Sequence, residues 1–208
     1  MPGQRRKRSI RVALAGIDGA GKSTAADDLH RRLESRGKRA VVCGVPGGRK
    51  TLDNWARRFG TSTGRILGVK GLDLVETLVR AAAMLRACLP WKGRDAPVIL
   101  DRSFYCQLAL RKSRGLRGRG LAGVLHALFP KPDLVVFFAI SPEQAFRRVR
   151  DRGADVESLE FLRAFDTGYR ALGEFKDFHI IAAGRSRTEV VDQLEAVICR
   201  AAGQLGQE

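Results

Sequence analysis

Residues 16–23 read GIDGAGKS, and they match the phosphate-binding pattern G-x-x-x-x-G-K-[ST] without a mismatch. Residues 10–15 just before them, IRVALA, are mostly apolar and predict a short buried strand. Residues 24–33 just after them predict a helix, because small and apolar residues recur there on one helical face. The pattern requires a strand, a glycine-rich loop and a helix in this order. The segment therefore predicts a site for nucleotide phosphates.

The residue types of this loop suit the binding of phosphate. Glycines let the backbone curl so that its N–H groups point at phosphate oxygens, and the helix that follows adds the positive end of its dipole. The ammonium group of Lys22 would reach the outer phosphates, and the hydroxyl of Ser23 would ligate Mg²⁺. The residues expected to hold the nucleotide are Gly16, Gly19, Ala20, Gly21, Lys22, Ser23 and Thr24.

Apolar segments that predict strands alternate with helical segments along the whole chain. Further strands are expected at residues 40–45, 97–100, 133–140 and 178–182. Helices are expected at residues 52–59, 72–89, from 142 onward, 155–174 and 187–202. Strands that are separated by helices need crossover connections. The sequence therefore predicts a three-layer α/β fold of the P-loop NTPase type, a five-stranded parallel sheet with helices on both faces.

Two helix starts have clear capping signals. Ser141 precedes Pro142 and is followed three residues later by Gln144, which is the arrangement of a capping box with proline at the first helical position. Residues 186–189, SRTE, form a second capping box before the last helix.

The chain of 208 residues suits a single domain. We find no internal repeat and no linker, and the most loop-like internal segment is residues 115–120, GLRGRG. We expect a basic N-terminal tail over residues 1–9 and one P-loop domain over residues 10–203, with a lid near residues 147–156.

The composition and the charge narrow the class of protein. The hydrophobic fraction of 44% is enough for a sizeable core, and no apolar run approaches the ~20 residues of a membrane span. The start of the chain lacks the pattern of a signal peptide, so we expect a cytoplasmic protein. The formal net charge is +16, and a basic surface attracts nucleic acid and phosphorylated small molecules alike. The basic clusters lack interleaved aromatic residues, so the sequence does not indicate a surface on which the bases of single-stranded nucleic acid would stack.

The cysteines do not suggest a metal site or a disulfide framework. There is no C-x-x-C pair among Cys43, Cys88, Cys106 and Cys199, so we expect reduced and mostly buried thiols.

Asp101 and Arg102 follow the third expected strand directly. In a parallel sheet of this kind, ligands bind at the carboxyl ends of the strands, so this pair is expected beside the phosphate loop. An acidic residue in this position holds Mg²⁺ in P-loop enzymes, directly or through water. Arg102 can hold a phosphate by charge-assisted hydrogen bonds. The alternative for the pair is a surface ion pair.

A second group of charged residues points to phosphoryl transfer. Four arginines lie within residues 147–152, and a lid with positive charge is commonly needed to close over a transferring phosphoryl group. We expect Arg147 and Arg152 to act there, although the sequence does not say which arginine inserts, and a solvated basic face is the alternative. Asp18 lies inside the phosphate loop, where a carboxylate is repelled unless it binds a hydroxyl, an ammonium group or metal-bound water. It therefore suggests a role on the acceptor side of the site, and a turn-capping carboxylate is the alternative.

Residues 16–24, GIDGAGKST, resemble the phosphate loop of thymidylate kinases, including the internal acidic residue. Residues 46–48, PGG, are similar to the Pro-Gly-Gly loop of that family, and Asp101-Arg102 to its Asp-Arg motif. The resemblance covers the chain from about Arg11 to Ala202. It implies a nucleoside monophosphate kinase fold, ATP with Mg²⁺ as donor, and phosphoryl transfer to a nucleotide phosphate.

The resemblance also assigns the acceptor half of the site. It implies that Arg57 or Arg58 binds the acceptor phosphate together with Arg102, that Asp18 acts beside them and that Arg80 contacts the acceptor base. It further implies a homodimer, and the expected helix over residues 72–89 is rich in Leu, Val and Ala. Gly19, with arginines in the lid, is similar to the subtype whose lid supplies the charge in the transition state.

The chain departs from the family pattern mainly at the acceptor base. Val45 stands where a glutamate usually precedes Pro-Gly-Gly, and Glu76 stands where an aromatic residue would stack on thymine. Cys106 stands for a serine, and residues 109–111, ALR, for Ala-Tyr-Gln. The residues that handle phosphate are unchanged.

Taken together, these features predict an ATP- and Mg²⁺-dependent kinase that phosphorylates a nucleoside monophosphate by positioning and electrostatics. The catalytic residues would be Lys22, Asp18, Asp101, Arg102, Arg147 and Arg152; the acceptor-binding residues Asp18, Arg57, Arg58, Arg80 and Arg102; and the metal ligands Ser23 and Asp101. A second reading keeps the donor site but takes a modified nucleotide, a nucleoside or another small phosphorylated acceptor. A third is a P-loop ATPase that binds nucleic acid, a partner we do not expect.

Overall fold

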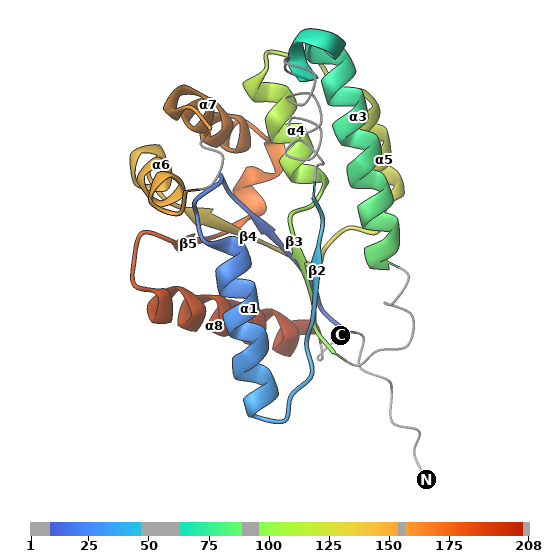
Figure 1. Cartoon of the computed structure of the whole chain (residues 1–208). Coiled ribbons are helices and arrows are strands. Elements are labelled where there is room, and N and C mark those ends of the chain that lie inside the picture. Colours follow the sequence, from blue (N-terminus) through green and yellow to red (C-terminus); the bar gives the residue numbers. More distant parts are fainter. Residues whose placement is uncertain (1–8, 47–62, 89–95, 154–156, 206–208) are drawn as a thin grey trace.

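A computed structural model describes residues 9–46, 63–88, 96–153 and 157–205, and for residues 63–66 it describes the backbone only. Five strands form one sheet: β1 (Arg11–Ala15), β2 (Val41–Gly44), β3 (Val98–Asp101), β4 (Leu134–Ala139) and β5 (His179–Ala182). The strand order is β2-β3-β1-β4-β5, and every neighbouring pair is parallel (Figure 1). All five strands lie within the expected segments, apart from the final Asp101 of β3, so the predicted parallel sheet is confirmed.

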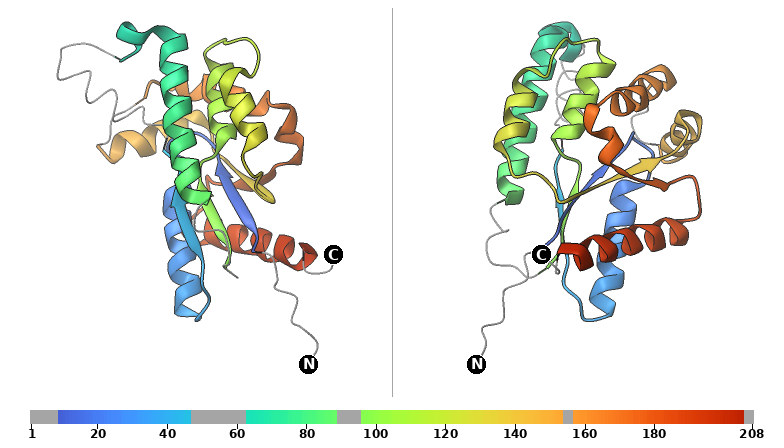
Figure 2. Two further views of the ribbon diagram at one scale, coloured as in Figure 1. Left: turned by 90° about the vertical axis from the view of Figure 1, so that its right-hand side faces the viewer. Right: turned by 180° about the vertical axis from the view of Figure 1, so that it is seen from behind.

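Helices cover both faces of the sheet and confirm the three-layer fold. They are α1 (Lys22–Ser35), α3 (Thr63–Cys88), α4 (Phe104–Ser113), α5 (Gly120–Leu128), α6 (Pro142–Asp151), α7 (Leu159–Arg170), α8 (Arg187–Leu205) and the 3₁₀ helix η2 (Gly173–Asp177). Helices α1 and α8 pack together on one face, and α3, α4, α5 and α7 lie on the other (Figures 1 and 2).

The core lies between the central strands and these helices. The first five residues of β4 are buried, as expected for a strand that is covered on both faces. From this strand, Phe137 packs edge-on against Tyr169 of α7 and Phe175 of η2, with ring centroids 5.4 and 5.0 Å away. These contacts pack α7 and η2 against β4, the strand next to β1 in the sheet.

Both predicted capping motifs form their hydrogen bonds at the start of a helix. The backbone N–H of Gln144 donates to Ser141 Oγ (3.3 Å), and Pro142 begins α6. In the second box Ser186 N donates to Glu189 Oε2 (3.0 Å) and Glu189 N to Ser186 Oγ (3.4 Å), so both residues cap each other.

Two predicted helices differ from the structure, and two further helices had no prediction. Helix α3 begins at Thr63 rather than residue 72, and it is kinked at Gly68, whose φ is 64°. The region of residues 155–174 contains α7 over Leu159–Arg170 and then the start of η2, instead of one continuous helix. Helices α4 and α5 were not predicted. In α4 the first eight residues are all buried, including the polar Gln107 and Arg111, so the pattern of polar and apolar residues does not mark an exposed face there.

Some predictions fall on residues outside the described ranges: the basic tail up to residue 8, the helix at residues 52–59, and the end of the lid at residues 154–156. In the part of the chain that the structure describes, no helix combines the length and the apolar character of a membrane span. All four cysteines are free thiols. Their expected burial is wrong in part, because Cys106 alone is buried, Cys43 and Cys88 are partly exposed and Cys199 is exposed.

Candidate active site

The phosphate loop runs from the carboxyl end of β1 into the first turn of α1, as the sequence predicts. Gly16, Gly19 and Gly21 have φ angles of 134°, 87° and 85°, which are values that favour glycine. A Cβ atom at Gly19 would collide with the backbone carbonyl of Ala145 in α6. This glycine therefore allows the loop and α6 to touch backbone to backbone.

Lys22 is buried at the start of α1, and its Nζ donates a hydrogen bond to Ile17 O within the loop (2.7 Å). Burial, together with the nearby positive charge of Arg102, lowers the pKa of this ammonium group to about 8, although Asp18 and Asp101 oppose the shift. The environment of Lys22 is therefore short of negative charge, which phosphate groups would supply.

Ser23 and Asp101 meet across the sheet edge, because β3 pairs with β1 and ends at Asp101. Ser23 Oγ donates to Asp101 Oδ2 at 2.5 Å. The other carboxylate oxygen, Oδ1, is buried and has no hydrogen-bond partner among the described residues. A buried, unpaired carboxylate oxygen beside a hydroxyl fits a Mg²⁺ site.

The rest of a Mg²⁺ coordination shell would have to come from phosphate oxygens and water. Within the described ranges, no group of three or more His, Cys, Asp or Glu side chains is arranged to hold a metal ion. This is compatible with Mg²⁺, which usually keeps several waters and binds through one or two carboxylates plus the phosphates of its substrate.

Arg102 follows β3 and forms an ion pair with Asp18 of the phosphate loop. Its φ of 81° is the single positive value of a non-glycine residue in the described ranges, and such strain is concentrated at functional sites. Nη1 of Arg102 also contacts Cys106 Sγ (3.5 Å). Burial alone would lower the pKa of Arg102, but the charge of Asp18 and other neighbours raises it, so the guanidinium stays charged.

Lys22, Ser23, Asp18 and Arg102 line a cavity of about 400 Å³. Its lining is formed by Asp18, Gly19, Gly21, Lys22, Ser23, Thr24, Arg102, Val149, Arg152 and Glu157. The phosphate loop, the end of β3 and the end of α6 thus meet at one place. Of the two predicted lid arginines, Arg152 lines the cavity, whereas Arg147 is exposed on α6 and lines neither this cavity nor the next one.

A second cavity of about 340 Å³ adjoins the first and shares Gly19, Gly21, Thr24 and Arg152 with it. Its remaining lining is Ala20, Ala25, Arg148, Asp151, Ala183, Arg185, Arg187 and Val190. Arg148 Nη1 donates to Ala183 O (2.9 Å), which joins α6 to the end of β5. The sequence analysis missed Ala183, Arg185 and Arg187, although they follow a strand just as Asp101 does. The rule that found Asp101 would have found them.

The predicted acceptor arginines do not all lie at these cavities. Arg57 and Arg58 are outside the described residues. Arg80 is buried on the inner face of α3, where its Nη1 donates to Val45 O (3.0 Å) at the end of β2. It lies outside both cavity linings.

The fold and the site define a P-loop protein whose phosphate loop lies at the carboxyl edge of a parallel sheet. The sequence profile of the thymidylate kinase family matches residues 14–194. The chain therefore belongs to the thymidylate kinase family, and it is a nucleotide kinase.

Individual relatives agree with this assignment over most of the chain. The thymidylate kinase of Xanthomonas campestris pv. campestris is 30% identical over 200 residues, which covers 91% of this chain and 83% of that protein. The probable thymidylate kinase of Archaeoglobus fulgidus is 30% identical over 154 residues, or 73% of this chain and 76% of that protein. Probable thymidylate kinase 1 of Saccharolobus solfataricus is 26% identical over 191 residues, which covers 90% of this chain and 95% of that protein.

Proposed function

We propose that the protein transfers the γ-phosphoryl group of ATP to the phosphate of a nucleoside monophosphate, giving ADP and a nucleoside diphosphate, with Mg²⁺ as cofactor. The observation that carries this proposal is the cavity of about 400 Å³ in which Lys22, Ser23 and Arg102 converge. It unites a phosphate loop with an arginine that can hold a second phosphate group. Since the relatives are named as thymidylate kinases, thymidylate is the first acceptor to test.

The donor half consists of the loop backbone and Lys22. On binding the outer phosphates, the Lys22 ammonium group would exchange its contact with Ile17 O for phosphate oxygens. The second cavity lies next to the loop on the side of Arg148 and Ala183, and we assign it to the nucleoside of the donor. A size of about 340 Å³ lies within the range of small-molecule pockets.

Ser23 and Asp101 would hold Mg²⁺, since the hydroxyl already lies against one carboxylate oxygen and the other is unpaired. When bound, this ion neutralises charge on the phosphates and keeps them in line for transfer.

The acceptor half is assigned to Arg102, Asp18 and Arg80, together with Arg57 or Arg58. Asp18 holds the guanidinium of Arg102 above the phosphate loop, so that a phosphate entering the cavity meets a positioned cation. Arg152, and Arg147 if α6 shifts inward, would neutralise charge on the transferring group.

The domain organisation and the location belong to the same proposal. We assign residues 10–203 to one kinase domain with a lid near residues 147–156 and a basic tail over residues 1–9. We also propose that the protein is located in the cytoplasm, where ATP and nucleoside monophosphates are found.

We further propose that the protein is a homodimer. Nine large hydrophobic side chains are exposed in the described ranges, and eight of them lie on α3 and α5, which run side by side (Figures 1 and 2). Exposed apolar patches of this kind mark interaction sites, and a patch on two neighbouring helices can pair with its own copy around a two-fold axis.

The test is an assay of ADP release with ATP, Mg²⁺ and a panel of nucleoside monophosphates and nucleosides. We expect transfer to a monophosphate, and we expect Lys22→Ala to abolish it without unfolding the protein. Lys38→Ala, which removes an exposed lysine outside both phosphate cavities, is the control and should retain full activity. If no monophosphate is phosphorylated, or if Lys22→Ala keeps the turnover of the original protein, the proposal is wrong.

A further inference from the structure

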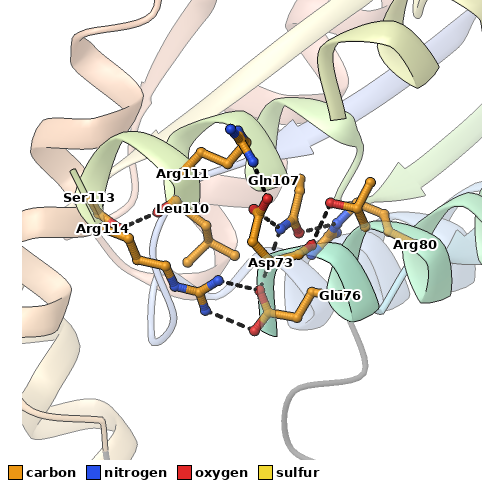
Figure 3. A network of polar contacts seen from close by, with 9 residues as sticks. Asp73, Glu76, Arg80, Gln107, Leu110, Arg111, Ser113 and Arg114 are labelled. Atoms are coloured by element: carbon orange, nitrogen blue, oxygen red, sulfur yellow. Dashed lines mark hydrogen bonds and ion pairs between the residues drawn. The ribbon is translucent and has the colours of Figure 1, made fainter. Parts of the chain in front are cut away.

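A buried polar network joins α3 to α4 (Figure 3), two helices that lie on the face of the sheet opposite α1 (Figure 1). Glu76 forms an ion pair through both carboxylate oxygens with Arg114 (2.7 and 2.8 Å), and Asp73 forms one with Arg111. Gln107 and Arg80 complete the network. Gln107, Glu76 and Arg80 are 0%, 1% and 2% exposed.

Such a network stabilises the packing of two helices less effectively than apolar residues can. Taking charged side chains out of water costs several kcal/mol per ion, and well-packed apolar residues of similar volume often give equal or greater stability. The presence of two carboxylates and three guanidinium groups between α3 and α4 therefore suggests a role beyond stability.

The hydrogen bonds of the network leave Gln107 a single orientation. Its amide nitrogen Nε2 donates to Asp73 Oδ1 (3.1 Å) and to Glu76 Oε2 (3.4 Å), and its oxygen Oε1 accepts from Arg80 Nε (3.4 Å). If the amide were turned over, its oxygen would face two carboxylates and its NH₂ group would face a guanidinium. The two carboxylates thereby fix which end of the amide is presented to Arg80.

Arg80 is in turn held at two points. Nε donates to Gln107 and Nη1 donates to Val45 O at the end of β2, and the second terminal nitrogen, Nη2, takes part in neither contact. The preceding residue of α4, Cys106, contacts Arg102. Two successive residues of α4 therefore contact two of the arginines that the proposed function places on the acceptor.

We propose that Gln107 is a positioning residue for Arg80, and that Asp73 and Glu76 act by orienting its amide. The proposal rests on the proposed function, in which Arg80 contacts the acceptor base. A guanidinium group offers only donors, so a fixed Arg80 fits a base that presents a carbonyl oxygen at this edge, as thymine and uracil do. It disfavours cytosine, which presents an amino group in the same position.

The test compares Gln107→Met with the original protein. Methionine has a similar length and no hydrogen-bonding amide, so the variant frees the guanidinium of Arg80 with little change in volume. We expect the KM for thymidylate to rise about tenfold or more, and the preference in kcat/KM for thymidylate over deoxycytidylate to fall by a similar factor. The KM for ATP should stay unchanged, because the donor site is not involved.

Asp133→Asn is the control, because it weakens another ion pair, the partly buried Arg11–Asp133, at the opposite end of the sheet. It should lower the stability while leaving both KM values and the base preference unchanged. If Gln107→Met does not fold, Glu76→Gln tests the same relay and should shift the thymidylate KM in the same direction by less.

Two results would overturn the inference and leave the proposed function standing. One is an original protein that phosphorylates deoxycytidylate as well as thymidylate or better. The other is a Gln107→Met variant in which the ATP and acceptor parameters change together, since a purely structural role for the network would act in that way. A protein that phosphorylates no nucleoside monophosphate would instead contradict the proposed function itself.

Discussion

Lys22 titrates in a range that experiments can reach. Burial lowers its pKa from 10.5 to about 8, so near pH 8.5 part of the protein carries a neutral amine at this position. Donor phosphates favour the ammonium form, so binding should raise the pKa and take up protons. We expect calorimetric binding enthalpies for an ATP analogue at pH 8.5 to differ between buffers of different ionisation enthalpy. At pH 6.5, and in Lys22→Ala, this difference should vanish. Equal enthalpies in all buffers at pH 8.5 would contradict the prediction.

The same shift has a definite sign for stability. The unfolded chain, in which Lys22 has its ordinary pKa, binds more protons than the folded chain between about pH 8 and pH 10.5. The contribution of this residue to the free energy of unfolding therefore rises with pH across that window. Denaturant unfolding of the original protein and of Lys22→Met should show this rise in the original protein only. If the free energy of unfolding changed with pH in the same way in both proteins, the predicted contribution of Lys22 would be ruled out.

Arg102 offers a test of backbone strain. Its φ of 81° suits glycine, and both Arg102→Gly and Arg102→Ala remove the same guanidinium group. We expect both variants to lose phosphoryl transfer, and the glycine variant to be the more stable one by about 1 kcal/mol, the reverse of the usual order. Thermal unfolding of the two variants measures the difference. An alanine variant of equal or greater stability would show that the left-handed conformation is not maintained.

At the scale of elements, the contact between α4 and α7 depends on one glycine. A Cβ atom at Gly168 would collide with the backbone carbonyl of Ala109, so the two helices approach too closely for any side chain there. We expect Gly168→Ala to destabilise the protein by about 1–3 kcal/mol. Gly203→Ala is the control, because nothing lies near that position in α8, and it should be neutral or stabilising. Denaturant unfolding would measure both, and a neutral Gly168→Ala would contradict the close approach.

The elements also show which parts of the fold the sequence could predict. The strands were predicted because each is a short apolar run, and β4 is the clearest example. The starts of α6 and α8 were predicted because capping is a local matter of three or four residues. Helix α4 was missed because it is buried nearly all round, so its polar residues do not mark a solvent-facing side.

The candidate site divides in the same way. Lys22, Ser23 and Asp101 could be predicted, because a local motif and the rule on strand ends place them. The role of Gln107 could not. It depends on carboxylates 31 and 34 residues away in the sequence and on the packing of α3 against α4.

At the scale of the whole molecule, the apolar face of α3 and α5 predicts the assembly. Leu78 on α3 is 51% exposed, and replacing it with a charged residue should split the proposed dimer. Ile180 on β5 is 56% exposed and lies on another element, so Ile180→Glu is the matched control. Light scattering after size-exclusion chromatography should give the mass of a monomer for Leu78→Glu and of a dimer for Ile180→Glu. A monomeric original protein would refute the assignment.

The contact between Gly19 and Ala145 has a mechanical consequence. Because two backbones touch there with no side chain between them, the phosphate loop and α6 have no compressible layer in which to slide past each other. Arg148 of the same helix holds the carbonyl at the end of β5. We therefore expect the phosphate loop, α6 and the end of β5 to move as one unit when donor phosphates bind.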